Sequence, residues 1–317
     1  MNDAAPDPEQ YPLPERRSNR PVTFAHRIEF VVFSVLMGLF RLLGIDRASA
    51  LCGRVMRFVG PKIRPLSRRG EDNLRMIFPD WPEEKIRATI TDVWENLGRT
   101  AAEYAHLDKL HIGGDNPRIV CADAEKVAKV FETHSRMVFV TGHFANWEVT
   151  GITAKQMDVP FGVVYRALDN PLIDEVIIKK RAAVATRRQI PKGMAGARPM
   201  IDLLKDNYSI AFLADQKLNT GGINVPFMGR MAMTAPAAAR LAVRFNLPVI
   251  PISNQRLNGA YFKVTNHNPI AFEPTGDLYA DVEALTIKIN EFLERDIRTR
   301  PEQWLWLHRR WGKRAKG

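Results

Sequence analysis

The residues best suited to chemistry lie in the segment 138–148, which reads VFVTGHFANWE. A strand-like apolar run ends at Gly142, His143 follows it, and Glu148 lies five residues further on. A carboxylate that accepts a hydrogen bond from one imidazole nitrogen fixes the tautomer and leaves the other nitrogen as a general base. Five residues of one continuous helix turn about 500°. The two side chains therefore meet only if His143 lies on the turn and Glu148 begins the next helix.

This segment contains no serine or cysteine that could act as a nucleophile. The pair therefore suits the deprotonation of a substrate hydroxyl, which then attacks an acyl donor directly. His143 is the only one of the seven histidines with an acidic residue five positions later. About one such spacing is expected by chance, so the spacing alone is weak evidence. A structural histidine that caps a helix fits the same pattern.

Two further polar residues end predicted strands. Arg166 closes the run FGVVYR and Asp215 closes YSIAFLAD. Open α/β sheets bind their ligands at this end of the strands. Arg181 lies one or two turns into the following helix, and an arginine near the base can bind a phosphate or stabilise an oxyanion. The alternatives are surface cations for Arg166 and Arg181, and a turn or capping residue for Asp215.

The glycine-rich pieces lack the order of strand, glycines and helix that a phosphate loop or a dinucleotide site requires. The histidines do not cluster at metal-ligand spacing. The two cysteines, Cys52 and Cys121, match neither a zinc site nor a disulfide framework, which favours a reducing compartment. We therefore expect no metal and no cofactor.

Short apolar runs alternate with helix-compatible stretches after residue 115. The predicted strands are 137–141, 161–165, 208–214, 247–253 and 261–265, and the predicted helices are 172–188, 197–206, 235–245 and 280–297. Strands that alternate with helices predict an α/β fold, with a largely parallel or mixed central sheet flanked by helices. An amphipathic helix over 82–107 precedes them.

The composition narrows the class of protein. A chain of 317 residues with 45% apolar and 26% charged residues is neither a polytopic membrane protein nor a disordered polymer. Its net charge of +11 calls for a polyanionic partner, which is nucleic acid, anionic lipid or an acidic carrier protein.

The N-terminal region favours anionic lipid as the polyanionic partner. Residues 28–45 form an apolar run, but its uncharged part, 30–40, is shorter than the roughly 20 residues that span a bilayer. The run is either a membrane-embedded or interfacial anchor or a helix packed in the protein. The segment 53–70 follows with no acid and six basic residues, Arg54, Arg57, Lys62, Arg64, Arg68 and Arg69. A basic segment beside an apolar helix is typical of binding to anionic lipid. Nucleic-acid recognition motifs are missing, so we expect no nucleic-acid partner.

Three regions follow from these patterns. Residues 1–23 are expected to be a disordered tail without the features of a signal peptide, and 24–70 an N-terminal hydrophobic anchoring helix with its basic segment. The α/β domain occupies 71–317. Near its end, the segment 301–312 carries three tryptophans among cations, which suits either the core or a membrane interface.

Several motifs together resemble the bacterial late acyltransferases of lipid A biosynthesis, the lauroyl and myristoyl transferase group. In order along the chain they are NLRMIFPDW (73–81), GHFANWE (142–148), VYRALDNPLID (164–174), LADQ (213–216), VPFMGR (225–230), TAPAAARLA (234–242) and PEQWLWLHRRW (301–311). The resemblance covers roughly residues 24–312 and is far more specific than the His–Glu spacing.

The resemblance implies an inner-membrane enzyme with its active site on the cytoplasmic side. It would move a fatty acyl chain from acyl carrier protein to a hydroxyl of a lipid A precursor, an anionic glycolipid, without an acyl-enzyme. His143 and Glu148 match the family's catalytic motif, with Glu148 expected to hold His143, and Arg181 matches an active-site arginine. The motif match also makes four residues substrate-binding candidates, Arg166, Asp215, Arg230 and Thr234.

Two alternatives stay open. An acyltransferase of the same superfamily could act on a lysophospholipid or another glycolipid. A non-catalytic basic adaptor at the membrane surface could retain the fold, and it predicts that His143 and Glu148 lie too far apart to form a hydrogen bond.

Overall fold

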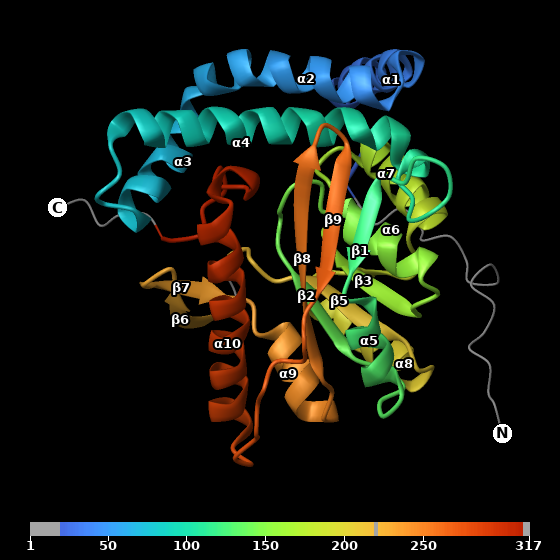
Figure 1. The fold of residues 1–317 in the computed structure, drawn as a ribbon, viewed down its shortest axis with the longest axis vertical. Helices are drawn as coiled ribbons and strands as arrows, with labels where there is room; N and C mark the ends of the chain where they lie inside the picture. Colours follow the sequence, from blue (N-terminus) through green and yellow to red (C-terminus); the bar gives the residue numbers. More distant parts are fainter. Residues whose placement is uncertain (1–19, 219–220, 313–317) are drawn as a thin grey trace.

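The computed structural model describes residues 20–218 and 221–312 (Figure 1). Most of the predicted N-terminal tail, residues 1–19, lies outside the described residues. A seven-stranded sheet forms the centre, in the order β1-β9-β8-β2-β5-β3-β4. Its strands are β1 (Ile119–Ala122), β2 (Val138–Thr141), β3 (Phe161–Tyr165), β4 (Gln189–Pro191), β5 (Ser209–Leu213), β8 (Val249–Asn258) and β9 (Tyr261–Asn266).

The sheet is mixed, as predicted. The β8–β9 pair is antiparallel, and the other neighbouring strands of this sheet run parallel. All five predicted strands are present at nearly the expected positions. The sequence analysis missed the three- and four-residue strands β4 and β1. It also missed a separate antiparallel hairpin, β6 (Ile223–Phe227) and β7 (Arg230–Thr234).

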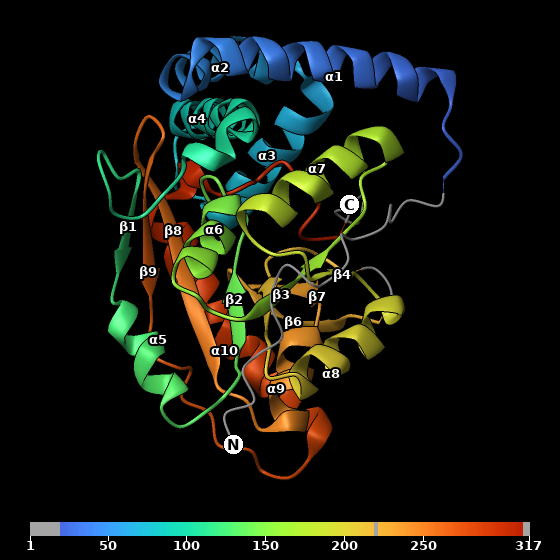
Figure 2. The same ribbon diagram turned by 90° about the vertical axis from the view of Figure 1, so that its right-hand side faces the viewer.

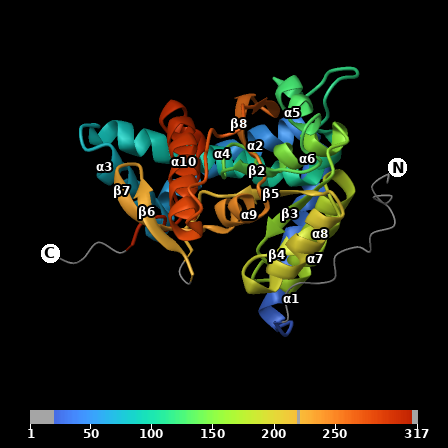
Figure 3. The ribbon, with the colours of Figure 1, turned by 90° about the horizontal axis from the view of Figure 1, so that it is seen from below.

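Helices cover both faces of the sheet because side chains alternate between them along each strand. Val138 and Val140 of β2 belong to the core cluster under α8 (Ala197–Lys205), α9 (Ala237–Phe245) and α10 (Leu278–Thr299). Phe139 belongs to the opposite cluster, under α5 (Ala124–Phe131) and α6 (Glu148–Gln156). The helix α7 (Pro171–Val184) contacts α6. From below, α10 lies beside the β6–β7 hairpin, away from α7 and α8 (Figure 3).

A layer of helices crosses the top of the sheet in Figures 1 and 2. It consists of α1 (Phe24–Leu43), α2 (Ile45–Val59) and α4 (Glu83–Glu103), and α3 (Arg64–Ile77) lies below the left-hand end of α4 in Figure 1. The predicted helix over 82–107 is α4, and its apolar face is buried through Ile86, Ile90 and Val93. Short 3₁₀ turns, η2 (Gly60–Lys62) and η3 (Tyr104–Lys109), follow α2 and α4.

The apolar run of the N-terminal region forms α1, which buries none of its residues. Polar contacts hold both of its ends. Asn170 donates to the carbonyl of His26 at 2.9 Å and to Glu29 at 2.8 Å, and Arg41 binds Asp108. Within 20–218 and 221–312, the structure contains no helix with the length and apolar character needed to traverse a bilayer.

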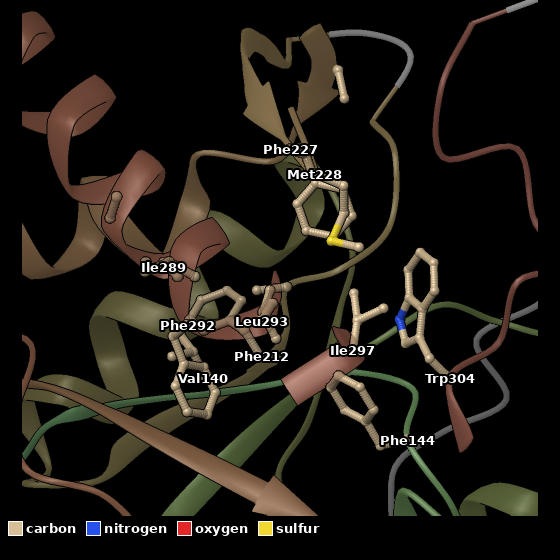
Figure 4. Packing of buried hydrophobic residues seen from close by; sticks show 14 of the residues in the cluster. Val140, Phe144, Phe212, Phe227, Met228, Ile289, Phe292, Leu293, Ile297 and Trp304 are labelled. Atoms are coloured by element: carbon tan, nitrogen blue, oxygen red, sulfur yellow. The ribbon is translucent and has the colours of Figure 1, made fainter. Parts of the chain in front are cut away.

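The C-terminal tryptophans are core residues. Trp304, Trp306 and Trp311 are at most 6% exposed. Trp304 lies in the cluster with Phe144 and Ile297 (Figure 4). The segment that carries them therefore packs on the loop after β2 instead of facing a membrane.

Candidate active site

The loop 142–147 joins β2 to α6, and hydrogen bonds from α4 and β8 hold its backbone. Ala145 lies in the left-handed region at φ 47°. The carbonyl of Ala145 accepts a hydrogen bond from Thr100 at 3.0 Å, and Asn254 donates to the carbonyls on either side, those of Phe144 and Asn146. These hydrogen bonds to its backbone oxygens fix the course of the loop that carries His143.

A buried ion pair supports this loop. Glu103 of α4 and Arg256 of β8 are fully and nearly fully buried, and their side chains are hydrogen-bonded to each other. Asn146 also donates to Glu103, at 3.0 Å. The sequence analysis missed this network, because its members come from three distant segments, α4, the loop 142–147 and β8, and no short motif joins them.

Asp215 is the carboxylate that holds His143. Its Oδ1 lies 2.8 Å from Nδ1 of the imidazole, and its Oδ2 accepts the backbone N–H of His143 at 2.9 Å. The indole N–H of Trp304 donates to the same Oδ2 at 2.8 Å. Strands β2 and β5 are parallel neighbours, so the residues that follow their ends meet at the same edge.

The charge state of Asp215 follows from these contacts. Burial alone would raise the pKa of its carboxyl, but the charge of His143 and the hydrogen bonds from His143 outweigh burial, so the pKa lies well below its ordinary value. An ionised carboxylate only accepts hydrogen bonds, so Nδ1 of His143 carries the proton. In the neutral imidazole, Nε2 then has the free lone pair, and the amide nitrogen of Gln216 lies 3.3 Å from it.

Glu148 has a different partner, which corrects the predicted His143–Glu148 pairing. Its carboxylate accepts hydrogen bonds from Nε and Nη2 of Arg181, at 2.8 and 2.5 Å, and from the hydroxyl of Tyr104. In the part of the chain that the structure describes, no hydrogen bond joins it to His143. The reason is geometric: Glu148 begins α6 and lies opposite α7, while the strand next to β2 supplies Asp215.

These three groups form one charged cluster, Tyr104–Glu148–Arg181. Burial opposes the charge on Glu148, but the charge and hydrogen bonds of Arg181 hold the pKa of the carboxyl below its usual range. Burial likewise opposes the Arg181 charge, yet Glu148 keeps the pKa of the guanidinium above its ordinary value. Burial and the Glu148 charge raise the pKa of Tyr104. The cluster therefore consists of a carboxylate, a guanidinium and a neutral phenol.

The two centres border one cavity of about 670 Å³. Its wall includes His143, Glu148, Arg181, Arg166 and Gln216. The remaining lining is mostly apolar and comes from the inner face of α1, from α4, α6 and α7, and from the sheet, including Phe33, Met37, Gly151, Phe139, Val163 and Ile177. A long, flexible apolar group fits such a wall, with its polar end at His143.

The structure places the other predicted site residues as follows. Asp215 is 0% exposed behind His143, where it orients the imidazole. Thr234 is 2% exposed, its hydroxyl accepts from Arg310 at 2.8 Å, and it lies outside the cavity lining. Arg230 is exposed in the β6–β7 hairpin and also lies outside that lining.

Tyr104, Trp304 and Gln216 are site residues that the sequence analysis did not single out for these contacts. Gln216 directly follows Asp215 at the end of β5, so its position carried a usable signal. Tyr104 follows α4, and the sequence analysis covered it only within the amphipathic helix over 82–107. Among residues 20–218 and 221–312, no group of three or more histidine, cysteine, aspartate or glutamate side chains could hold a metal ion.

Comparison with known sequences identifies the family. Residues 18–313 match the family described as "Bacterial lipid A biosynthesis acyltransferase". The chain belongs to this family. It is similar to the lipid A biosynthesis myristoyltransferase of Escherichia coli K12, with 23% identity over 81% of this chain and 78% of that protein.

Two other relatives have comparable similarity. The Haemophilus influenzae lipid A biosynthesis acyltransferase is 22% identical over 81% of this chain and 79% of its own length. The E. coli K12 lipid A biosynthesis lauroyltransferase is 25% identical over 77% of this chain and 78% of its own length. The chain is therefore an acyltransferase enzyme.

Proposed function

We propose that this enzyme transfers a fatty acyl chain from the thioester of acyl carrier protein to a hydroxyl of a lipid A precursor. The observation that carries the proposal is the Asp215–His143 pair at the wall of a large apolar cavity. The cavity suits a fatty chain, and the imidazole lies where the polar end of that chain would react. The names of the relatives support lipid A as the acceptor class.

The chemistry begins with proton removal. Asp215 holds Nδ1–H of His143, and Nε2 takes the proton of the acceptor hydroxyl in place of its contact with Gln216. The acceptor oxygen attacks the thioester carbonyl and forms the new C–O bond. As the tetrahedral intermediate collapses, the C–S bond breaks and the protonated His143 gives its proton to the leaving thiolate. No acyl-enzyme forms.

The tetrahedral intermediate carries a negative charge on the former carbonyl oxygen. Arg181 lines the same cavity as His143, and Glu148 and Tyr104 fix its guanidinium. A cation held in this way before the reaction stabilises an oxyanion without reorganisation. In this proposal Glu148 contributes by orienting Arg181, while Asp215 orients the base.

The outer surface of the helical layer supports action at a membrane. Exposed apolar side chains lie along α1 and α2, including Val31, Val35, Leu39, Leu42, Val55 and Phe58. Four exposed cations follow in the chain: Arg54 lies on α2, Lys62 in η2, and Arg64 and Arg68 on α3. An apolar face beside cations binds an anionic bilayer, with about 1 kcal/mol per charge. We place the enzyme at the cytoplasmic side of the bacterial inner membrane, where its net charge of +11 also favours an acidic carrier protein.

The test is an acyl-transfer assay followed by mass spectrometry. It offers acylated carrier protein with either a lipid A precursor or a lysophospholipid, and it includes the His143→Ala variant. The expected result is transfer to the lipid A precursor, reduced about 10³-fold in the variant, with the variant still folded at the assay temperature. Transfer only to the lysophospholipid would contradict the acceptor assignment. Near-normal turnover by His143→Ala would contradict the role of the base.

A further inference from the structure

Two cations, Arg166 and Lys192, lie along the same carboxyl edge of the sheet as the base His143. In the order β2-β5-β3-β4 all neighbours are parallel, and the residues just past these strands include His143, Gln216, Arg166 and Lys192. The pairing of Tyr165 with Pro191 puts Arg166 and Lys192 side by side. Figure 2 places β4 at the side of the sheet opposite β1.

The spacing of this row follows from sheet geometry. Neighbouring strands lie about 4.8 Å apart, so along the edge the backbone of Arg166 lies about 10 Å from that of His143, and that of Lys192 about 14 Å. The side chains of Arg166 and Lys192 are long, so their charged ends can lie closer to His143 than these backbone distances. Arg166 itself contributes to the cavity wall that contains His143. A ligand that reaches from His143 to both cations therefore needs the span of about one or two sugar rings.

Opposite charges neutralise this pair of cations poorly. Arg166 is 74% exposed, and its ion-pair partner Asp169 lies 3.9 Å away and is itself bound by Arg20 at 2.9 Å. Lys192 has no ion pair with the residues described at 20–218 and 221–312. By contrast, Lys179 on the neighbouring helix α7 pairs with Glu175 at 2.6 Å.

Two charged groups near the edge of the sheet act on the ammonium group of Lys192. Partial burial and then the charge of Arg166 lower the pKa of its ammonium group, while the Asp215 carboxylate opposes both. The charges of Arg166 and Asp215 therefore both act on the Lys192 ammonium group. The hydrogen bonds from His143 and Trp304 already engage the Asp215 carboxylate, so Asp215 is not a partner for Lys192.

We propose that Arg166 and Lys192 bind a phosphate group on the acceptor, beside the hydroxyl that His143 deprotonates. This inference rests on the proposed acyl transfer to a phosphorylated glycolipid. A guanidinium can bind two phosphate oxygens at once, and an ammonium adds a compact charge. Together they fix the position of the sugar along the edge, and they thereby select the hydroxyl that reaches Nε2.

The experiment compares acceptors with and without their sugar phosphates, removed by a phosphatase. Lys192→Gln and Arg166→Gln are measured with wild type, and Arg198→Gln on α8 is the matched exposed-cation control. We expect each of the two variants to raise KM for the phosphorylated acceptor about tenfold, with a much smaller effect on kcat. With the dephosphorylated acceptor, the variants and wild type should have the same KM. Equal KM values for both acceptors in wild type would overturn the proposal.

A second arm tests the other source of phosphate, the phosphopantetheine of the donor. Acyl-pantetheine, which lacks that phosphate, replaces the acylated carrier protein. If the Lys192→Gln effect vanishes with this donor and persists with the dephosphorylated acceptor, the cations bind the donor and the acceptor assignment is wrong. If the effect follows the acceptor with both donors, the proposal is supported.

Equilibrium binding separates this inference from the proposed function. The phosphorylated and dephosphorylated glycolipids are titrated in detergent into wild type and Lys192→Gln. Phosphate-dependent binding that Lys192→Gln weakens about tenfold supports the inference, even if wild type transfers no acyl group and the proposed function fails. Turnover by wild type without phosphate-dependent binding retains the proposed function and overturns the inference.

Discussion

Two buried carboxylates flank the loop after β2, and they belong to different centres. Asp215 accepts the Nδ1–H of His143, the backbone N–H of His143 and the indole N–H of Trp304. Glu148 accepts from Arg181 and Tyr104. Glu148 is five residues from His143 in sequence and Asp215 is 72, yet the distant residue holds the base. Strand order, and not sequence spacing, decides which carboxylate reaches the imidazole.

The largest expected effect comes from Asp215→Asn. The amide cannot accept on both of its terminal atoms, so Nδ1–H is no longer held and the tautomer with a free Nε2 is lost. We expect kcat to fall about 10³-fold, within the range for loss of general-base catalysis. The measurement is steady-state acyl transfer. The matched control is Asp206→Asn, an exposed residue shortly before the same strand, which should leave kcat unchanged.

If Asp215→Asn retained more than a tenth of the wild-type kcat while remaining folded, the comparison between the two carboxylates would fail. Circular dichroism at the assay temperature establishes the folded state.

Glu148→Gln should act mainly through Arg181. It leaves a guanidinium that is only 16% exposed without its carboxylate, and breaking such a pair costs about 3 kcal/mol of unfolding free energy. Urea unfolding measures this cost. Glu175→Gln is the control, because its pair with Lys179 is solvent-exposed and is expected to contribute under 1 kcal/mol.

The stability difference between wild type and Glu148→Gln should also depend on pH. The pKa of Glu148 is lowered in the folded protein, so its stabilisation is present above the unfolded value of about 4.3 and is lost as pH falls through the folded pKa. Wild type should therefore lose its stability advantage over Glu148→Gln on acidification below about pH 4. An advantage that grew on acidification would contradict the ionised pair.

Tyr104→Phe is a smaller perturbation of the same centre. The hydroxyl donates to Glu148 and accepts from Nη2 of Arg181 at 3.1 Å, while the Glu148–Arg181 pair itself remains. We expect a loss of about 1.5 kcal/mol, measured by urea unfolding. Tyr279→Phe, at an 83% exposed position of α10, should change stability by less than about 0.5 kcal/mol. Equal effects of the two substitutions would mean that the hydroxyl contributes nothing to the cluster.

The smallest expected effect is in the cavity and leaves both carboxylates in place. Gly151 lies on α6 with Glu148, and a Cβ there would lie 3.2 Å from Cβ of Ala185. Gly151→Ala should take the space of about one methylene. It should shift the kcat/KM ratio between the preferred acyl donor and a shorter one about fourfold toward the shorter donor. Competition between the two donors, followed by mass spectrometry, measures the shift.

Gly38→Ala provides the control for this substitution. Gly38 lies on α1, and a Cβ at this position meets no atom within 4 Å. Donor preference should be unchanged. A shift equal to that of Gly151→Ala would remove the link between cavity space and chain length.

Much of the sheet was predictable, because β2, β3, β5, β8 and β9 are apolar runs bounded by polar or glycine residues. The strands β1 and β4 are three or four residues long, too short for a periodicity to register. The positions of His143, Asp215 and Arg166 at strand ends were also predictable. Their pairing was not, because the order β2-β5-β3 depends on long-range packing that no local pattern encodes.

The C-terminal tryptophans illustrate the same limit. Their interleaving with cations suits a membrane interface as well as a core. Only the fold places Trp304 against Phe144 and its indole N–H on Asp215. Similarly, α1 was predictable as an apolar helix, but its polar end contacts and its place over the cavity come from α7 and η3.

The most direct test of the central claim is the ¹⁵N NMR spectrum of the His143 imidazole. Histidine-labelled wild type, Asp215→Asn and Glu148→Gln are compared at mildly alkaline pH, with His143→Gln used to assign the signal. We predict a protonated Nδ1 and an unprotonated Nε2 in wild type and in Glu148→Gln, and a loss of this tautomer in Asp215→Asn. A tautomer that changes in Glu148→Gln and persists in Asp215→Asn would contradict the account.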